Sequence, residues 1–74
     1  MTAKTKIILF NGRWQAYENT QVMVSNRNGK DAQIFCRASD VQIGDNVWEH
    51  NIVSTIEFHD EPIDGVKFHY GPTI

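Results

Sequence analysis

The side chains best placed to bind a metal ion are two histidines and a carboxylate in the last third of the chain. Glu57 and His59 alternate along one predicted strand, and the hairpin that we expect there sets His69 opposite Glu57. Imidazole and carboxylate groups are common zinc ligands. A solvated strand face with ordinary polar residues explains the same pattern, and Lys67, opposite His59, would repel a cation. We therefore expect neither a bound metal nor another cofactor.

The other chemically reactive residues do not form a catalytic pattern. Most carboxylates fall in predicted turns, where solvation is the default, so a general acid–base pair is not expected. Cys36, the only cysteine, lies on the inward face of a predicted strand and should pack as a small hydrophobic residue. The five glycines are scattered over separate turns and form no phosphate-binding loop. We expect a protein without enzymatic activity.

Charge divides the chain into two unequal halves. Residues 1–37 carry six basic and two acidic residues, whereas residues 38–74 carry one basic and seven acidic residues. A basic groove with aromatic platforms is typical of proteins that bind single-stranded nucleic acid, so this is the alternative function. The side chains that would serve it are Lys4, Lys6, Arg13, Arg27, Lys30 and Arg37. The pI of about 5.8 argues against it, because nucleic-acid-binding domains are usually basic.

Docking onto a protein partner, or self-association, is the function that we expect. Protein interfaces favour aromatic and arginine side chains at a dry centre with a polar rim. The predicted contact residues are Arg13, Tyr17, Phe35 and Trp48, with the acidic turn Asp60, Glu61 and Asp64 as a second surface. Trp14 and Trp48 could instead fill the core. A basic half and an acidic half can also pair head to tail between copies of the chain.

The first predicted element is a β-hairpin. Residues 7–10 are rich in β-forming side chains, and the following Asn11 and Gly12 tolerate positive φ, which is the strongest short hairpin signal. Residues 13–17 return as the second strand. A two-residue turn sets Leu9 opposite Trp14, and Ile7 opposite Ala16, so that one face of the hairpin is apolar.

The second predicted hairpin pairs residues 22–25 with residues 32–37, and two registers compete. A two-residue turn would mix apolar and polar residues on both faces. A three-residue loop with Gly29 in the left-handed region pairs Val22 with Ile34 and is the register that we prefer. It builds one apolar face from Val22, Val24, Ala32, Ile34 and Cys36. Met23, Gln33 and Phe35 then point away from that face.

The rest of the chain predicts a turn followed by short strands. Ser39 and Asp40 can cap a single helical or 3₁₀ turn with Ile43 tucked beneath it, and Asn51 is a candidate for positive φ. Residues 52–59 and 66–70 alternate apolar and polar side chains, which predicts an amphipathic hairpin. We therefore expect a single all-β domain over residues 1–74, either a small antiparallel barrel or a strongly bent sheet of five to six strands.

A resemblance at the level of the fold begins with the run from Ala38 to Trp48. A polar residue, an apolar residue and the Gly44-Asp45 pair precede a short strand there, and this pattern resembles small SH3-like barrels. The resemblance implies a shape shared by protein-binding, nucleic-acid-binding and virion proteins. The chain length is also similar to that of many small phage-encoded accessory, inhibitor or virion proteins. The longest apolar run, residues 7–10, is far shorter than a membrane span of about 20 residues, and we expect a cytoplasmic protein.

Overall fold

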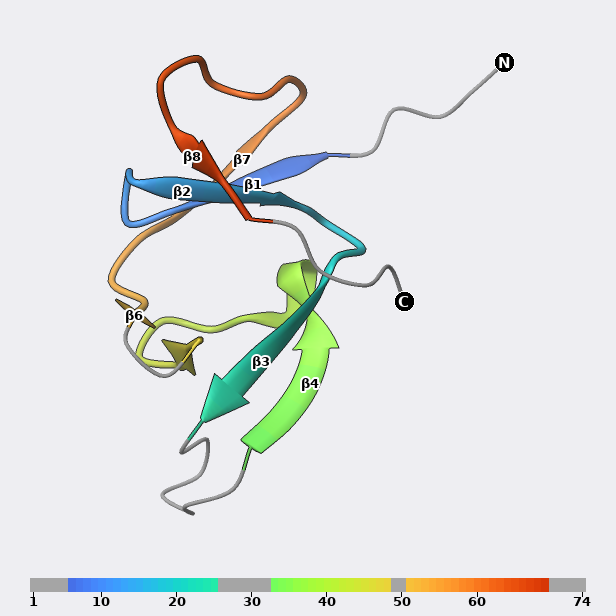
Figure 1. Ribbon diagram of the computed structural model, residues 1–74, viewed down its shortest axis with the longest axis vertical. Helices are drawn as coiled ribbons and strands as arrows, with labels where there is room; N and C mark the ends of the chain where they lie inside the picture. The colour runs from blue at the N-terminus through green and yellow to red at the C-terminus, as the bar shows by residue number, and fades with distance from the viewer. Residues whose placement is uncertain (1–5, 26–32, 49–50, 70–74) are drawn as a thin grey trace.

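The strands of this protein form two small sheets. The computed structural model describes residues 6–25, 33–48 and 51–69. Across the first sheet, the strands run in the order β7 (Ile56–His59), β1 (Ile7–Phe10), β2 (Trp14–Tyr17) and β8 (Lys67–Phe68). Across the second, the order is β4 (Gln33–Arg37), β3 (Gln21–Ser25), β5 (Asn46–Val47) and β6 (Asn51–Ile52). Figure 1 shows the first sheet lying above the second.

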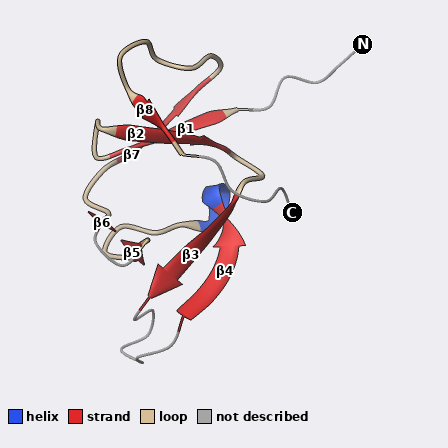
Figure 2. Ribbon diagram, viewed as in Figure 1, coloured by secondary structure: helices blue, strands red, loops and turns tan. Residues whose placement is uncertain are grey.

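The expected all-β architecture is confirmed. Of its two expected forms, the small barrel is wrong, and the described strands outnumber the five to six that we expected. Over the described ranges, eight short strands and one 3₁₀ turn, η2 (Ala38–Asp40), make up the regular structure (Figure 2). Within residues 6–25, 33–48 and 51–69, the two sheets keep open edges instead of closing on one another. Both sheets contribute to one hydrophobic core, which consists of Ile8, Phe10, Trp14, Ala16, Val22, Val24, Ala38, Val41, Val47 and Val53.

The first hairpin forms, but its register differs by one residue from the expected one. Phe10 pairs with Trp14 and Ile8 with Ala16, across the three-residue loop 11–13. Because a shift of one residue exchanges the two faces, Ile8 and Phe10 enter the core while Leu9 lies on the opposite face. All four residues of β1 are nevertheless buried. The uniform apolar pattern of β1 fits either register, which is why the sequence could not choose between them.

In the second hairpin the faces are confirmed and the register is wrong. Val22 pairs with Cys36 and Val24 with Ile34, a shift of two residues from the preferred register. A shift of two preserves side-chain alternation, so Val22 and Val24 still point into the core and Phe35 still points away. The expected loop at Gly29 and the expected position of Ala32 lie outside the described residues.

The expected C-terminal hairpin does not exist. β7 pairs antiparallel with β1, and β8 pairs parallel with β2, so these two strands occupy opposite edges of the first sheet. Residues 60–66 connect them by crossing over the sheet (Figure 1). The physical reason is that all four residues of the apolar strand β1 are buried. Their burial requires a strand along each edge of β1 and a segment that covers the outer face of the sheet.

The turn before β5 also differs from its expected form. The expected 3₁₀ turn forms as η2, but its N-cap residue is Arg37, which makes no side-chain capping hydrogen bond. Instead the buried carboxylate of Asp45 accepts a hydrogen bond of 2.8 Å from the backbone N–H of Gln42. Ile43 is exposed rather than tucked beneath the turn.

Candidate functional site

The most exposed aromatic side chain among the predicted contact residues is Phe35, which lies on an edge strand. Among the strands that the structure describes, β4 is the outermost of the second sheet and has a neighbour, β3, on one side only. The Phe35 side chain is 61% exposed, and Ile34 beside it is also exposed. Phe35 pairs with the half-buried Met23 on the face that points away from the core. We call the side of Gln33–Arg37 that faces away from β3, together with these side chains, the β4 edge.

The backbone groups that β4 directs toward this edge follow from the alternation of an antiparallel sheet. The N–H of Ala38 donates to the carbonyl of Thr20 (2.8 Å), so hydrogen-bonded pairs between β3 and β4 recur at even-numbered positions. On the other side of β3, the N–H of Trp48 donates to the carbonyl of Met23 (3.1 Å). Phe35 and Arg37 therefore point their backbone N–H and C=O groups away from β3.

The β4 edge lacks most of the features that protect edge strands. Natural sheets shield their edges with inward charges, prolines, bulges or very short strands. β4 spans five residues and carries a single charged side chain, Arg37, at its end. The β7 edge of the other sheet is followed directly by Asp60, Glu61 and Pro62, whereas β6 and β8 are two residues long. Among the described edges, β4 is the one best suited to accept another strand.

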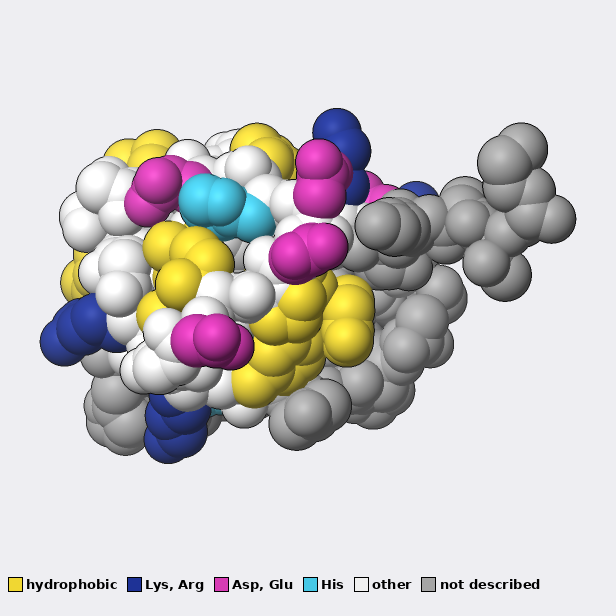
Figure 3. All heavy atoms as spheres, turned by 90° about the horizontal axis from the view of Figure 1, so that it is seen from above, with side chains coloured by type: hydrophobic (Ala, Val, Ile, Leu, Met, Phe, Trp, Pro, Cys, Tyr) yellow, Lys and Arg dark blue, Asp and Glu magenta, His cyan; other side chains and the backbone are white. Residues whose placement is uncertain are grey.

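Tyr17 belongs to a different surface, on the outer face of the first sheet. Its ring packs against that of Phe68, with centroids 5.0 Å apart. Asp60, Glu61 and Asp64 are exposed on the connection that crosses this face. Figure 3 shows hydrophobic side chains bordered by acidic ones when the molecule is seen from above. The acidic turn is thus brought near Tyr17, and both lie on a different sheet from Phe35.

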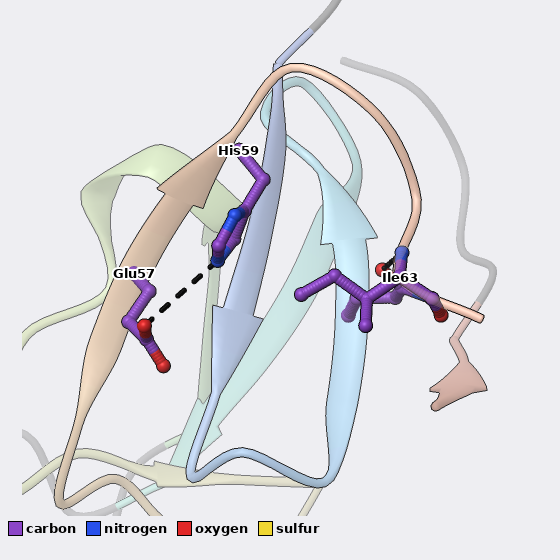
Figure 4. Close-up of polar contacts among 4 residues, drawn as sticks. Glu57, His59 and Ile63 are labelled. Atoms are coloured by element: carbon purple, nitrogen blue, oxygen red, sulfur yellow. Dashed lines mark hydrogen bonds and ion pairs between the residues drawn. The ribbon is translucent and has the colours of Figure 1, made fainter. Parts of the chain in front are cut away.

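The 60–66 connection is held in place by one buried glutamine. The amide oxygen of Gln15 accepts from the N–H of Ile63 (2.8 Å), and its amide nitrogen donates to the carbonyls of Ile63 (3.0 Å) and Val66 (3.4 Å). Gln15 is only 2% exposed. Ile63 lies over β2 in Figure 4. Sequence reasoning missed this residue, since a glutamine in an amphipathic strand normally indicates the solvated face.

The predicted polar face of Glu57, His59 and His69 does not form, because His69 lies apart from the other two residues. Figure 4 shows Glu57 and His59 turned toward one another on β7, with 3.9 Å between Oε1 and Nε2. His69 follows β8 at the opposite edge of the sheet, where its ring meets Trp14 edge-on at 5.0 Å. The described residues contain no group of three or more candidate metal ligands.

His69 supplies a prediction about pH. Burial, and secondly the charge of Lys67, lower the pKa of the His69 imidazole from its usual value of 6.5. The unfolded chain therefore binds a proton at His69 more readily than the folded chain does. As the pH falls from 6.5 toward the folded pKa, folding stability should decrease, and this loss should be smaller in His69→Gln. An NMR titration of the His69 ring should give a midpoint below 6.5, and a midpoint above it would contradict the prediction.

Trp48 is neither fully buried nor an exposed anchor. It is half-buried, packs against the core, and stacks on His69 with centroids 6.2 Å apart and planes 16° apart. Strand alternation after the buried Val47 would turn Trp48 away from the core. Its φ of 55° breaks that alternation, and it is Trp48, not Asn51, that adopts positive φ. Trp14, by contrast, is a core residue, stacked on Phe10 at 4.2 Å.

The described basic residues of the predicted nucleic-acid surface are distributed over the first hairpin and β4. Lys6 precedes β1, next to Glu18, whose N–H donates to the Lys6 carbonyl. Arg13 lies in the loop at the other end of that hairpin, and Arg37 lies on β4. Lys4, Arg27 and Lys30 lie outside the described residues. Arg13 is thus also remote from Tyr17, at the opposite end of β2.

The β4 edge could be predicted from the sequence only in part. Alternation in residues 22–25 and 33–37 already places Met23 and Phe35 on the face away from the core. The order of strands in the sheet, which leaves β4 without a second neighbour, has no local sequence signal. The described residues contain no helix long and apolar enough to cross a membrane. Comparisons with protein-family models, with curated proteins and with solved structures give no match.

Proposed function

We propose that this chain is a non-enzymatic binding module that docks onto a protein by accepting an extended segment at the β4 edge. In this mode of recognition, backbone hydrogen bonds provide affinity and side-chain contacts provide specificity. The observation that carries the proposal is Phe35, an aromatic side chain 61% exposed on a strand whose outward backbone groups face no neighbouring strand among the described residues. The surface around Tyr17 and the acidic 60–66 connection is a second contact area.

The energetics of Phe35 support a role in binding. Complete burial of a phenylalanine side chain contributes roughly 1.5–3 kcal/mol, and aromatic residues are frequent among the dominant contacts of protein interfaces. In the free protein much of that contribution is unused because the ring faces solvent. Binding of a partner strand that covers Phe35 and Met23 together would gain this burial free energy.

Binding of single-stranded nucleic acid is the less favoured alternative. It needs a continuous positive groove lined by aromatic rings. Lys6 and Arg13 lie at opposite ends of one hairpin, and Trp14, the aromatic residue next to Arg13, is buried in the core. The geometry of the described basic residues therefore supports this function less well than protein binding.

The resemblance of residues 38–48 to small SH3-like domains stays part of the proposal. So do a phage origin, as an accessory, inhibitor or virion protein, and a cytoplasmic location. The two-sheet all-β architecture around one core is compatible with an open relative of such domains.

Substitution of Phe35 should abolish partner capture. The chain is immobilised as wild type, as Phe35→Lys and as Phe58→Lys, and proteins retained from a lysate of the source cells are quantified by mass spectrometry. Phe58 is a matched control, since it is 59% exposed but lies on β7. We expect a protein that wild type and Phe58→Lys retain equally and that Phe35→Lys retains at least tenfold less.

Two outcomes would contradict the proposed function. Equal retention by wild type and Phe35→Lys would show that the β4 edge is not the contact surface. Binding of labelled single-stranded DNA or RNA that weakens steeply between low and physiological salt, and that Arg13→Glu reduces, would favour the nucleic-acid alternative.

A further inference from the structure

We propose that the β4 edge pairs with the β4 edge of a second copy of the chain, antiparallel and about a two-fold axis that passes beside Phe35. This inference rests on the proposed function, because it names the occupant of the same edge. Antiparallel pairing of two identical strands is isologous, so one surface serves both subunits and the assembly closes as a dimer. The two second sheets would merge into one continuous sheet.

The direction of the backbone groups restricts the register of such a pair. Phe35 and Arg37 point their N–H and C=O groups outward, and Ile34 and Cys36 point theirs toward β3. Outward groups must meet outward groups, so odd-numbered positions must face odd-numbered positions. Centring the pair on Phe35 meets this condition, and the two Phe35 residues then exchange two backbone hydrogen bonds.

That register also uses the whole strand. The residues of β4 run from 33 to 37, so a pair centred on position 35 overlaps along all five. The neighbouring allowed registers are centred on Ile34 and on Cys36, and each would overlap only three of these five residues. The register centred on Phe35 therefore gives the longest ladder.

Side chains on both faces match their counterparts across the proposed joint. On the face away from the core, Phe35 meets Phe35 of the partner subunit, with Met23 flanking the pair on each side. On the other face, Ile34 meets Cys36 of the partner subunit. The charge of Arg37 lies opposite the neutral Gln33 of the partner subunit, so like charges do not face each other across the ladder.

A five-residue ladder predicts a weak dimer. Stable protein interfaces bury about 800 Å² on each partner, and one pair of short strands covers less than that. A dissociation constant on the order of 10–100 µM is therefore expected. The chain should be monomeric at about 1 µM and largely dimeric at about 1 mM.

Sedimentation equilibrium over this concentration range tests the dimer. The wild-type mass should rise from 8.5 kDa toward twice that value. Phe35→Lys, which sets two ammonium groups against each other at the axis, should weaken association at least tenfold, whereas Phe58→Lys should leave it unchanged. Circular dichroism would establish that each variant is folded.

A thiol cross-link tests the register independently. Ile34 and Cys36 of the partner subunit would form a non-hydrogen-bonded pair, whose short Cβ separation suits a disulfide. In Ile34→Cys, oxidised glutathione should link the introduced thiol to Cys36 of the other copy, each disulfide releasing two glutathione thiols. Peptide mapping should find this intermolecular link, and wild type, with Cys36 alone, should cross-link at least tenfold more slowly.

The possible failures of this inference are distinguishable from failure of the proposed function. A wild-type chain that stays monomeric at 1 mM, or a dimer that Phe35→Lys leaves intact, would overturn self-pairing. If capture of another protein still depended on Phe35 in that case, the β4 edge would stand as a docking surface for a different protein. A cross-link between two Cys36 residues in wild type that forms as fast as the link in Ile34→Cys would overturn the register centred on Phe35.

Discussion

Replacing Gln15 by leucine should lower the free energy of unfolding by about 3 kcal/mol, because each buried polar group left without a partner costs about 1–3 kcal/mol. The substitution keeps the approximate size of the side chain but removes its hydrogen bonds. The N–H and C=O groups of Ile63 and the carbonyl of Val66 would lose their contacts with the amide. Urea denaturation followed by tryptophan fluorescence would measure the loss.

This loss is large compared with the total free energy of unfolding that a chain of this length can have. At 0.05–0.15 kcal/mol per residue, a chain of 74 residues is stable by roughly 4–11 kcal/mol. Losing about 3 kcal/mol would therefore remove a large part of the total. Because the lost contacts belong to the 60–66 connection, hydrogen exchange at Ile63 should accelerate more than exchange in β3.

Gln42→Leu is the matched control for Gln15→Leu. Gln42 is exposed, so the same chemical change there should alter stability by less than about 0.5 kcal/mol. If the two variants were equally stable, the amide of Gln15 would not be what holds the connection over the sheet.

Gln15 also explains why the outer face of the first sheet could not be predicted. Sequence reasoning treats a polar residue in an alternating strand as solvated, and so gives no sign that Gln15 is buried. The structure buries it, because the backbone of a connection far along the chain satisfies its amide. A local pattern does not record such a long-range partner.

The two faces of the second hairpin were predicted correctly, and the pairing of the C-terminal strands was not, for the same reason. Alternation fixes which side chains share a face, so the inward position of Val22 and the outward position of Phe35 were predictable. Alternation does not determine which strands are neighbours. Residues 56–59 and 67–68 alternate as a hairpin would, yet each pairs with a different strand of the first hairpin.

Replacing Asn11 by alanine should destabilise the fold by about 2–3 kcal/mol. Asn11 has a φ of 56°, and a left-handed backbone costs an ordinary residue roughly 1–2 kcal/mol. Its side chain also joins the first hairpin to the segment before β7. Oδ1 accepts from the N–H of Ser54 (2.7 Å) and of Thr55 (3.2 Å), and Nδ2 donates to the carbonyl of Ile52 (2.8 Å). Urea denaturation would measure the change.

Two further variants at Asn11 separate backbone strain from side-chain bonding. Asn11→Gly keeps the left-handed backbone without strain but loses every side-chain bond, so it should cost about 1 kcal/mol. Asn11→Asp keeps the acceptor for Ser54 and Thr55 and loses only the donor to Ile52, so it should also cost about 1 kcal/mol. Alanine should then be the least stable of the three. If glycine were as destabilising as alanine, the contribution of Asn11 would come from its bonds alone, and the turn geometry that made this residue conspicuous in the sequence would contribute little.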